Sequence, residues 1–499
     1  MNINKSKYCG YCQCPKLVWL KKNKSEEFVV DEGVQDRASI SNEICKLQRK
    51  LFGKFVDVLS LVDDITNVEK LLNKTKEVLN SKAKVIVDAS FEFDGMYCVV
   101  DILKKEDAGY SIYRTKSSTK PNQHAYMVEI AFQKYILQKC GINVVNTYVI
   151  NVNTKYDFKY KLNLNKLFKI TNVTELVDQE LAKVENNVCN LKTIMQMEEE
   201  PNVDLNVGCH SPYTCGFWQY CSKHLPNPSV FDLYATSIQK KISYYKQGII
   251  TFEDIKAKCD DLDHIQNMQI EHTLENKETV FDKENIDKFL NKLWYPIYFL
   301  DFETVQNGIP IYKRSRPYQP IPFQYSLHYI LKPNGEVYHK EFLAEPFKDP
   351  RKQIAKSLLN DIPTNACVLA FNKFFEGDRI RDLAKLFPRK RKNLLAISKN
   401  IFDLMDPFAN GYVYNKNMGN SLSIKSILPA LYPNDPSLNY ENLNGVNNGN
   451  DAMVIFQKMK NMTADEMCEA KRELLEYCKL DTYAMVKIFE YLTNHNNLT

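Results

Sequence analysis

The stretch "IYFLDFETV", residues 297–305, places two carboxylates at the end of an apolar strand. Four apolar or aromatic residues lead into Asp301, and Glu303 follows after one phenylalanine. Side chains along a strand alternate between its two faces, so these two acids project to the same side. An unpaired buried charge is costly, and a divalent cation is the natural reason to bring two carboxylates together. The alternative is a pair of solvated acids at an exposed strand end.

Two later stretches supply the further oxygen ligands that such a cation needs. "LAFNKFFEGDRI" runs a strand into a turn that carries Glu376, with Asp378 two residues further on. "LLEYCKLDTYAMVKIFEYL" is an amphipathic helix that presents Tyr477 and Asp481 four residues apart, and hence on one face. Both stretches extend the site predicted from the first.

The three segments together resemble the DEDD superfamily of 3′–5′ exonucleases. The first motif of that family, Asp-x-Glu, matches Asp301 and Glu303. The second, Asn-x-x-Phe-Asp, matches "NKFFE", in which Glu376 replaces the aspartate. The third, Tyr-x-x-x-Asp, matches Tyr477 and Asp481 and would make this the tyrosine subclass.

This resemblance covers about residues 290 to 495 and implies an RNase H-like α/β domain. In the family the four carboxylates hold two Mg²⁺ or Mn²⁺ ions, one of which generates hydroxide while the other stabilises the leaving 3′ oxygen. Tyr477 would orient the attacking water through its hydroxyl. Because Glu376 is longer than the family's aspartate, Asp378 is the alternative ligand.

Two stretches of the same half combine basic and aromatic residues. "RSRPYQPIPFQYSLH" contains Arg314, Arg316 and Tyr318, and "NSLSIKSILPALYP" places Lys425 where a helix could begin. Aromatic rings can stack on bases while basic groups contact phosphates, so these residues are candidates for nucleic-acid binding. Ordinary packing of the rings and a solvated face for the bases form an equal alternative.

The N-terminal half has a mixed order of strands and helices. The strand-like runs "KVIVDASFEF" and "MYCVVDILKK" are joined by Asp94-Gly95, a strong hairpin signal, and a third strand, "GYSIYRTKSS", follows. The helical "QHAYMVEIAFQKYILQKCG" and another strand, "VVNTYVINVN", come next. The cysteine-rich "YCGYCQCPK" opens this half, and "GCHSPYTCGFWQYC" adds three cysteines after it.

This half resembles the iron–sulfur PD-(D/E)XK nucleases, which include CRISPR adaptation nucleases and the nuclease domain of AddB-type helicase complexes. In them, one cysteine from the beginning of the domain and three from its end close over an iron–sulfur cluster, here expected as [4Fe–4S]. The ligands that the resemblance implies are Cys14, Cys209, Cys215 and Cys221. Cys9 and Cys12 compete with the first of these, and a zinc site or unligated thiols are the alternatives.

The nuclease core of that family uses one acid, an aspartate on a hairpin strand, and Asp/Glu-x-Lys on the next strand. Asp88, Asp101 and Lys116 match these positions, and Gln133 resembles part of a helical motif of RecB nucleases. Arg114, however, stands where the last acid belongs. A guanidinium repels the required cation but attracts phosphate, so we expect this domain to bind nucleic acid and to cut poorly or not at all. The alternative is a surface strand with ordinary basic residues.

The chain length of 499 residues suggests about two to four domains. We expect a nuclease-like domain with the cysteines over residues 1–226, a helical connector over 227–290 and the DEDD-like domain over 291–499. No long apolar run is present and the start lacks the apolar core of a signal peptide, so we expect a cytoplasmic protein with no membrane contact. In that reducing compartment the 14 cysteines favour metal ligation or burial over disulfides.

The formal charge of +5 is small for this length and identifies no partner by itself. Both halves together resemble an uncharacterised bacterial family that fuses an iron–sulfur PD-(D/E)XK-like region to a DEDD-like region. We therefore expect a nuclease that removes nucleotides from 3′ ends, with DNA the favoured substrate and RNA open. A dual nuclease with both sites active and a non-catalytic scaffold that recruits a helicase or other nucleases are the alternatives.

Overall fold

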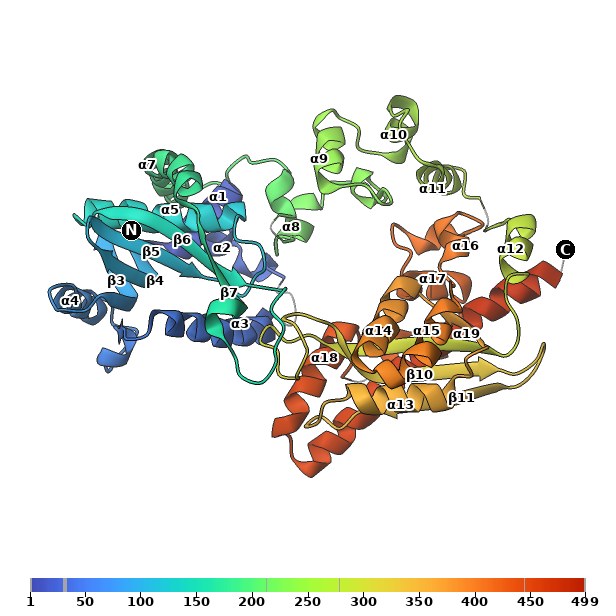
Figure 1. Cartoon of the computed structure of the whole chain (residues 1–499). Coiled ribbons are helices and arrows are strands. Elements are labelled where there is room, and N and C mark those ends of the chain that lie inside the picture. The colour runs from blue at the N-terminus through green and yellow to red at the C-terminus, as the bar shows by residue number, and fades with distance from the viewer. Residues whose placement is uncertain (1, 30–33, 212, 278, 444, 498–499) are drawn as a thin grey trace. The chain divides into compact units, whose positions relative to one another are not determined.

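The computed structural model describes residues 2–29, 34–211, 213–277, 279–443 and 445–497 (Figure 1). Contacts between backbone segments divide the chain into two compact units. Unit 1 comprises Met1–His224 and Asn307–Tyr318, and unit 2 comprises Leu225–Gln306 and Gln319–Thr499. This division groups the predicted helical connector with unit 2, and the three-part division expected above stays a prediction.

Within the described residues, unit 1 is built on a seven-stranded mixed sheet of order β2-β3-β4-β5-β6-β7, with β1 paired to β4. Its strands are β1 (Ile3–Asn4), β2 (Val56–Asp57), β3 (Val85–Phe93), β4 (Met96–Glu106), β5 (Gly109–Thr115), β6 (Val144–Val152) and β7 (Phe168–Asn172). Strand β4 lies antiparallel to β3 and β5, whereas β5 and β6 are parallel. Asp94 and Gly95 have φ values of 48° and 71°, as a tight hairpin turn requires, so the hairpin predicted at this dipeptide is confirmed.

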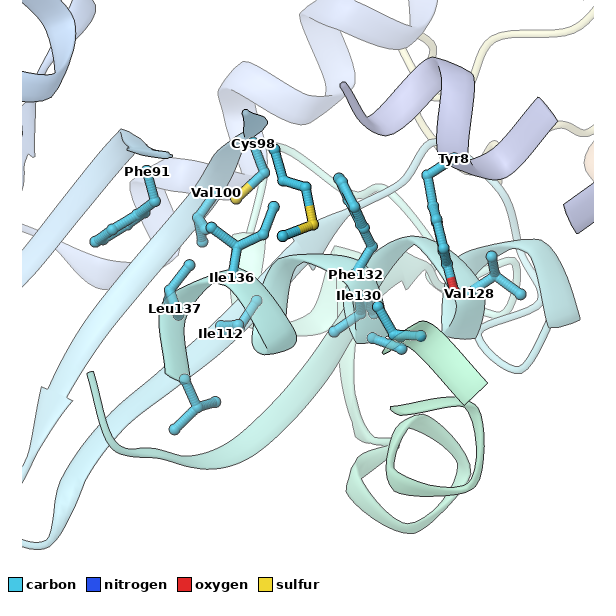
Figure 2. Close-up of a cluster of buried hydrophobic side chains, with 14 of the residues drawn as sticks. Tyr8, Phe91, Cys98, Val100, Ile112, Val128, Ile130, Phe132, Ile136 and Leu137 are labelled. Atoms are coloured by element: carbon cyan, nitrogen blue, oxygen red, sulfur yellow. The ribbon is translucent and has the colours of Figure 1, made fainter. Parts of the chain in front are cut away.

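Helices cover the sheet of unit 1 and complete its core. They are α1 (Lys5–Gln13), α2 (Pro15–Asn23), α3 (Val34–Arg49), α4 (Val68–Leu79), α5 (His124–Lys139), α6 (Leu164–Leu167), α7 (Thr174–Gln196) and α8 (Trp218–Ser222). Helix α5 is apolar on most of its circumference and is therefore buried, packing against α1, α7 and the sheet. Figure 2 shows Tyr8 of α1 beside Phe132 of α5, and their rings stack with centroids 4.5 Å apart.

A segment from the C-terminal half of the sequence, Asn307–Tyr318, is part of unit 1 although it connects two strands of unit 2. The Arg314 N–H donates to the Phe158 carbonyl at 2.6 Å, and the Phe158 N–H donates to the Ser315 carbonyl at 3.0 Å. The hydroxyl of Tyr318 donates to the carbonyl of Ser117. These bonds hold the segment against the rest of unit 1.

Unit 2 begins with the helical region over residues 225–290. Its elements are α9 (Ile238–Lys246), α10 (Phe252–Lys258), α11 (His264–Leu274), β8 (Val280–Phe281) and α12 (Lys283–Leu290). A small core of its own contains Leu233, Phe252 and Ile270. The helices predicted in this stretch are thus present.

In the part of the chain that the structure describes, unit 2 contains a five-stranded mixed sheet of order β11-β10-β9-β12-β13. These strands are β9 (Ile297–Val305), β10 (Ile321–Ile330), β11 (Val337–Leu343), β12 (Cys367–Ala370) and β13 (Ile401–Asp403). The central strand β9 is antiparallel to β10 and parallel to β12. A strand in this position is covered on both faces, which explains why β9 is almost continuously apolar.

The remaining elements of unit 2 are mostly helices that pack on this sheet. They are α13 (Arg351–Asp361), α14 (Lys373–Leu386), α15 (Arg391–Lys399), α16 (Asp406–Ala409), β14 (Val413–Tyr414), α17 (Ile424–Leu431), α18 (Gly449–Lys458) and α19 (Ala464–Asn497). The long helix α19 packs against β9, β10 and β11, while α13 and α14 contribute to the core with β9 and β10. Both units therefore have the predicted mixed α/β class. In the described ranges, no helix combines the length and the apolar character needed to cross a bilayer.

Candidate functional site

The structure brings together the four carboxylates that were predicted from three distant segments. Asp301 and Glu303 project from β9, Glu376 from α14 and Asp481 from α19, and all four line one pocket of about 490 Å³. Glu303, Glu376 and Asp481 are buried, and Asp301 is half-buried. Residues as far apart in the chain as Asp301 and Asp481 thus converge on one cavity.

Electrostatics indicate that this carboxylate site has an excess of negative charge. Burial raises the pKa of Asp301, and the neighbouring Asp481 raises it further. Burial, Asp301 and Asp481 likewise raise the pKa of Glu303, and burial and Asp301 raise that of Glu376. Carboxylates that share a site resist simultaneous ionisation unless a cation compensates them. A divalent ion is therefore the ligand that this arrangement favours.

Glu376 is aimed into the pocket by the turn that starts α14. Asn372 precedes the helix in a left-handed conformation, with φ of 79°. Asp403 at the end of β13 accepts the N–H groups of Asn372 and Lys373 at 3.0 Å and 2.9 Å. Among the described residues, the Oε2 atom of Glu376 is buried without a hydrogen-bond partner. The alternative ligand Asp378 instead forms an exposed ion pair with Arg381.

Helix α19 presents Tyr477 and Asp481 to the same pocket, as their four-residue spacing predicts. Tyr440, which the sequence did not single out, donates its hydroxyl to Asp481 Oδ1 at 2.7 Å. A hydrogen bond from Tyr477 also lowers the pKa of Asp481, although burial raises that pKa overall. The ammonium group of Lys425 donates to the Tyr477 hydroxyl at 3.4 Å.

Cys478 is a second residue that sequence reasoning missed. One ligand atom each from Asp301, Glu303 and Cys478 lies within 4.8 Å of the others. The thiol donates weakly to Asp301, with Sγ 3.7 Å from Oδ2. Because Cys478 follows Tyr477 in the sequence, its closeness to the carboxylate pocket could have been predicted. No local pattern marks Tyr440.

A comparison with models of protein families gives a match that overlaps this site. A family model described as "Domain of unknown function (DUF2779)" matches residues 298–423. The matched range includes Asp301, Glu303 and Glu376 and ends before Lys425 and Asp481. No protein with a curated description matches the chain. The match therefore assigns no activity.

The residues predicted as a degenerate nuclease site lie together in unit 1. Asp101 accepts hydrogen bonds from Arg114 and, at 2.8 Å and 2.6 Å, from the N–H and hydroxyl of Thr115. Arg114 also pairs with Glu129 of α5 at 2.6 Å, and Lys116 pairs with the same carboxylate at 2.8 Å. The sequence did not single out Glu129. Burial opposes its ionisation, but the charges of Arg114 and Lys116 hold its pKa below the ordinary value.

Charge in this unit 1 cluster is compensated by the protein itself. Asp88, whose pKa burial raises to about 6, accepts two hydrogen bonds from Arg49 at 2.7 Å and 2.8 Å. Lys5 pairs with Glu129 at 2.6 Å. In the described part of the cluster, four carboxylates, among them Asp57 at 3.9 Å from Arg49, thus face four basic side chains. These residues do not fit a divalent cation, because the negative charge of the carboxylates is already compensated by basic groups.

Gln133 follows Glu129 by one helical turn on α5 and lies in the core of unit 1. Its side chain is fully buried and donates to the Val99 carbonyl at 2.8 Å. This bond joins α5 to β4 and gives the residue a structural role.

The four cysteines expected as cluster ligands lie near one another. Cys14, Cys215 and Cys221 border one small apolar cluster with Trp19 and Phe217. Burial raises the pKa of the Cys209 thiol, and the neighbouring Cys14 and Cys215 raise it further.

Gln13 and Gly208 bring the two cysteine-bearing segments into contact. The Gln13 side chain donates to the Gly208 carbonyl at 2.9 Å. A Cβ at Gly208 would stand 2.2 Å from the Gln13 carbonyl, so only glycine permits this approach. The chain beside Cys14 is thereby joined to the chain beside Cys209.

The kind of group that these four sulfurs could hold stays a prediction. A tetrahedral zinc site has sulfurs about 3.8 Å apart. Among the described residues, no three of the four cysteine sulfurs lie within 4.8 Å of one another. An iron–sulfur cluster has a wider ligand span, and its ligation by these cysteines stays a prediction. The competing Cys9 and Cys12 border the main core instead.

The basic and aromatic residues predicted to bind nucleic acid divide between the two units. Lys425 lines the pocket of unit 2, whereas Arg314, Arg316 and Tyr318 belong to unit 1. The Tyr318 ring packs against an apolar cluster, and burial raises its pKa to about 12. Arg314 and Arg316 are exposed. A role of these three in nucleic-acid binding stays a prediction.

Proposed function

We propose that unit 2 is a metal-dependent nuclease that removes nucleotides from the 3′ end of DNA or RNA. The convergence of four carboxylates from β9, α14 and α19 in one pocket carries this proposal. Their raised pKa values and the unpartnered Oε2 atom of Glu376 support a cation as the missing partner. The 3′ polarity rests on the DEDD resemblance.

The donor set fits Mg²⁺ or Mn²⁺, which prefer oxygen ligands. Asp301, Glu303, Glu376 and Asp481 would hold the ions. Two such ions would supply an activated water and stabilise charge on the leaving oxygen. In the net reaction the water oxygen bonds to phosphorus and the P–O3′ bond breaks. Protons from the water go to the leaving oxygen and to solvent, which yields a nucleoside 5′-monophosphate and a strand shortened by one residue.

The protein's own groups then bind and orient the 3′ end. Asp481 is held by the Tyr440 hydroxyl on Oδ1, which would fix the orientation of this carboxylate as a ligand. The Tyr477 hydroxyl stands at the same carboxylate, where it can align water. A pocket of about 490 Å³ accommodates a terminal nucleotide.

For unit 1 we propose nucleic-acid binding without cleavage. Its acids are neutralised by Arg49, Arg114, Lys116 and Lys5, and this supports the expectation of an inactive nuclease centre. We further propose a [4Fe–4S] cluster at Cys14, Cys209, Cys215 and Cys221. Anaerobic purification followed by visible absorption, iron, sulfide and zinc analysis tests this. One equivalent of zinc without iron would contradict the cluster.

The nuclease proposal is tested with strands labelled at either end. DNA and RNA strands are incubated with Mg²⁺ or Mn²⁺ and the wild-type protein or Asp301→Asn, which keeps the side-chain shape but removes a charged ligand. Stepwise loss from the 3′ end, abolished in the variant, is the expected result. Internal cuts that persist in Asp301→Asn and vanish in Asp101→Asn would favour a dual nuclease. Binding without cleavage under either metal would favour a scaffold.

A further inference from the structure

Lys425 of α17 contributes a positive charge to the carboxylate pocket. Of the described residues that line this pocket, Lys425 is the one with a basic side chain. Its charge opposes the increase that burial causes in the pKa values of Asp301, Glu303 and Asp481. A permanent positive charge beside a metal site weakens metal binding. The presence of Lys425 here therefore indicates that its charge serves another function.

Aromatic rings and neutral acceptors hold the Lys425 ammonium group. It lies 4.7 Å from the ring centroid of Tyr440 and 4.9 Å from that of Tyr477. Its described acceptors are the Asn447 carbonyl and the Tyr477 hydroxyl, both neutral. An ammonium group has three N–H donors, so this arrangement orients the charge and leaves capacity for an anionic ligand.

Resting on the proposed nuclease function, we propose that Lys425 is a catalytic residue that contacts the phosphate of the 3′-terminal nucleotide and holds the Tyr477 hydroxyl. By donating to the hydroxyl oxygen, Lys425 directs the O–H bond of Tyr477 away from itself. The same ammonium neutralises a non-bridging phosphate oxygen, whose negative charge would otherwise meet the surrounding carboxylates. The ligand that Lys425 recognises is therefore a phosphate monoester or diester of a nucleotide.

The test separates metal binding from catalysis in Lys425→Met and Lys425→Arg. Manganese binding is followed by electron paramagnetic resonance, and turnover is measured on a 3′-labelled strand. In Lys425→Met we expect kcat to fall on the order of 100-fold, because a charge that stabilises the transition state is lost. Manganese affinity should be retained or become tighter, because a competing cation is removed. Arginine should restore part of kcat, since it keeps the charge.

Product inhibition tests the phosphate contact directly. With Mn²⁺ present, thymidine 5′-monophosphate should inhibit Lys425→Met at a concentration about 10-fold higher than wild type, because a charge-assisted hydrogen bond is lost. Thymidine, which has no phosphate, should bind both proteins equally. Lys479→Met is the matched control, because it removes an exposed lysine from α19 whose charge acts on His328 and His339. This control should match wild type in manganese affinity, in kcat and in inhibition by thymidine 5′-monophosphate.

The outcomes distinguish this inference from the nuclease proposal. If wild type shows no metal-dependent trimming, or if its trimming persists in Asp301→Asn, the nuclease proposal and the role of Lys425 are both overturned. If wild type trims and Asp301→Asn does not, a Lys425→Met variant with normal kcat overturns the role of Lys425 alone. A parallel loss of manganese affinity and kcat in Lys425→Met also overturns it, because Lys425 would then only support the carboxylates.

Discussion

Single side chains of the site act through hydrogen bonds that fix each carboxylate. Tyr440 holds one oxygen of Asp481, and Asp403 holds the turn that aims Glu376. Such supporting partners tune both the orientation of a metal ligand and its affinity for the ion. The carboxylates therefore depend on residues that would not contact the ions themselves.

Replacing Tyr440 by phenylalanine isolates one such bond. The ring over which Lys425 lies is kept, while the hydroxyl that donates to Asp481 is lost. We expect manganese affinity to fall about 10-fold, measured by paramagnetic resonance titration. Tyr414→Phe is the control, because the Tyr414 hydroxyl is buried without a partner among the described residues. Equal affinity in both variants would show that the Tyr440 hydroxyl is dispensable.

The environment of two neighbouring histidines, His328 and His339, predicts how the free energy of unfolding depends on pH. His328 on β10 is buried, its Nδ1 lies 2.8 Å from Thr482 Oγ1, and its ring centroid is 4.5 Å from that of His339. Burial lowers the pKa of His328 to about 3, with further decreases from His339 and Lys479. In the unfolded chain His328 therefore binds a proton with a pKa near 6.5, whereas in the folded protein it stays neutral at that pH.

This histidine stabilises the fold fully above pH 6.5, and its contribution is lost as pH falls. We expect the free energy of unfolding to decrease by about 1.4 kcal/mol per pH unit below 6.5 on account of His328. Urea denaturation of wild type and His328→Asn at pH 7.5, 6.5 and 5.5 measures this, because the variant should lack that part of the slope. His339 and Glu341 remain in both proteins. Identical slopes would contradict the burial of a neutral imidazole.

At the scale of elements, β9 and α14 owe their roles to their neighbours. Strand β9 lies between β10 and β12, so its acids emerge in the interior of unit 2 and not at an exposed edge. Helix α14 begins where β12 ends, and Asp403 of the adjacent β13 closes the turn between them. The site thus depends on the pairing of parallel strands β12 and β13 as well as on its own residues.

Asp403→Ala tests the link between this turn and the site. The change leaves the backbone N–H groups of Asn372, Lys373 and Met405 without their acceptor. We expect a loss of about 3 kcal/mol in the free energy of unfolding, measured with urea. Manganese affinity should fall about 10-fold as Glu376 moves.

Asp378→Ala on the same helix is the control for that experiment. Its side chain is 57% exposed and pairs with Arg381, so it should change stability by less than about 1 kcal/mol. A strong loss of manganese affinity in Asp378→Ala would instead revive Asp378 as a ligand.

On the scale of the whole molecule, unit 1 is assembled from two separate parts of the chain. Segment 307–318 follows the strand that carries Asp301 and precedes β10, yet it packs in unit 1. Ile309 and Tyr318 border the apolar cluster that contains Ile44. The fold of unit 1 is therefore incomplete without residues from the C-terminal half.

A truncated polypeptide measures this dependence. Residues 1–224 alone should unfold at a lower temperature than the same polypeptide carrying residues 307–318 on a flexible linker. We expect the free energies of unfolding of the two polypeptides to differ by on the order of 2 kcal/mol, because the segment buries the apolar surface of Ile309 and Tyr318. Thermal unfolding followed by circular dichroism checks this. Scrambling the attached segment should remove the gain, and equal stability with and without the native segment would refute it.

The sequence by itself determined those features that depend on local order. The Asp94-Gly95 turn, the apolar run of β9 and the four-residue spacing of Tyr477 and Asp481 each act over a few residues, so pattern was sufficient. The convergence of Asp301, Glu303, Glu376 and Asp481 was predicted from the need of a cation for further oxygen ligands and from a resemblance that linked the three segments.

Only the tertiary structure decided which distant groups meet. Glu129 neutralises Arg114, Tyr440 holds Asp481, and segment 307–318 joins unit 1. No local signal marks these contacts, because they arise when chain segments tens to hundreds of residues apart are packed together. Burial then makes each contact matter, since a charge or hydroxyl removed from water must find its partner within the protein.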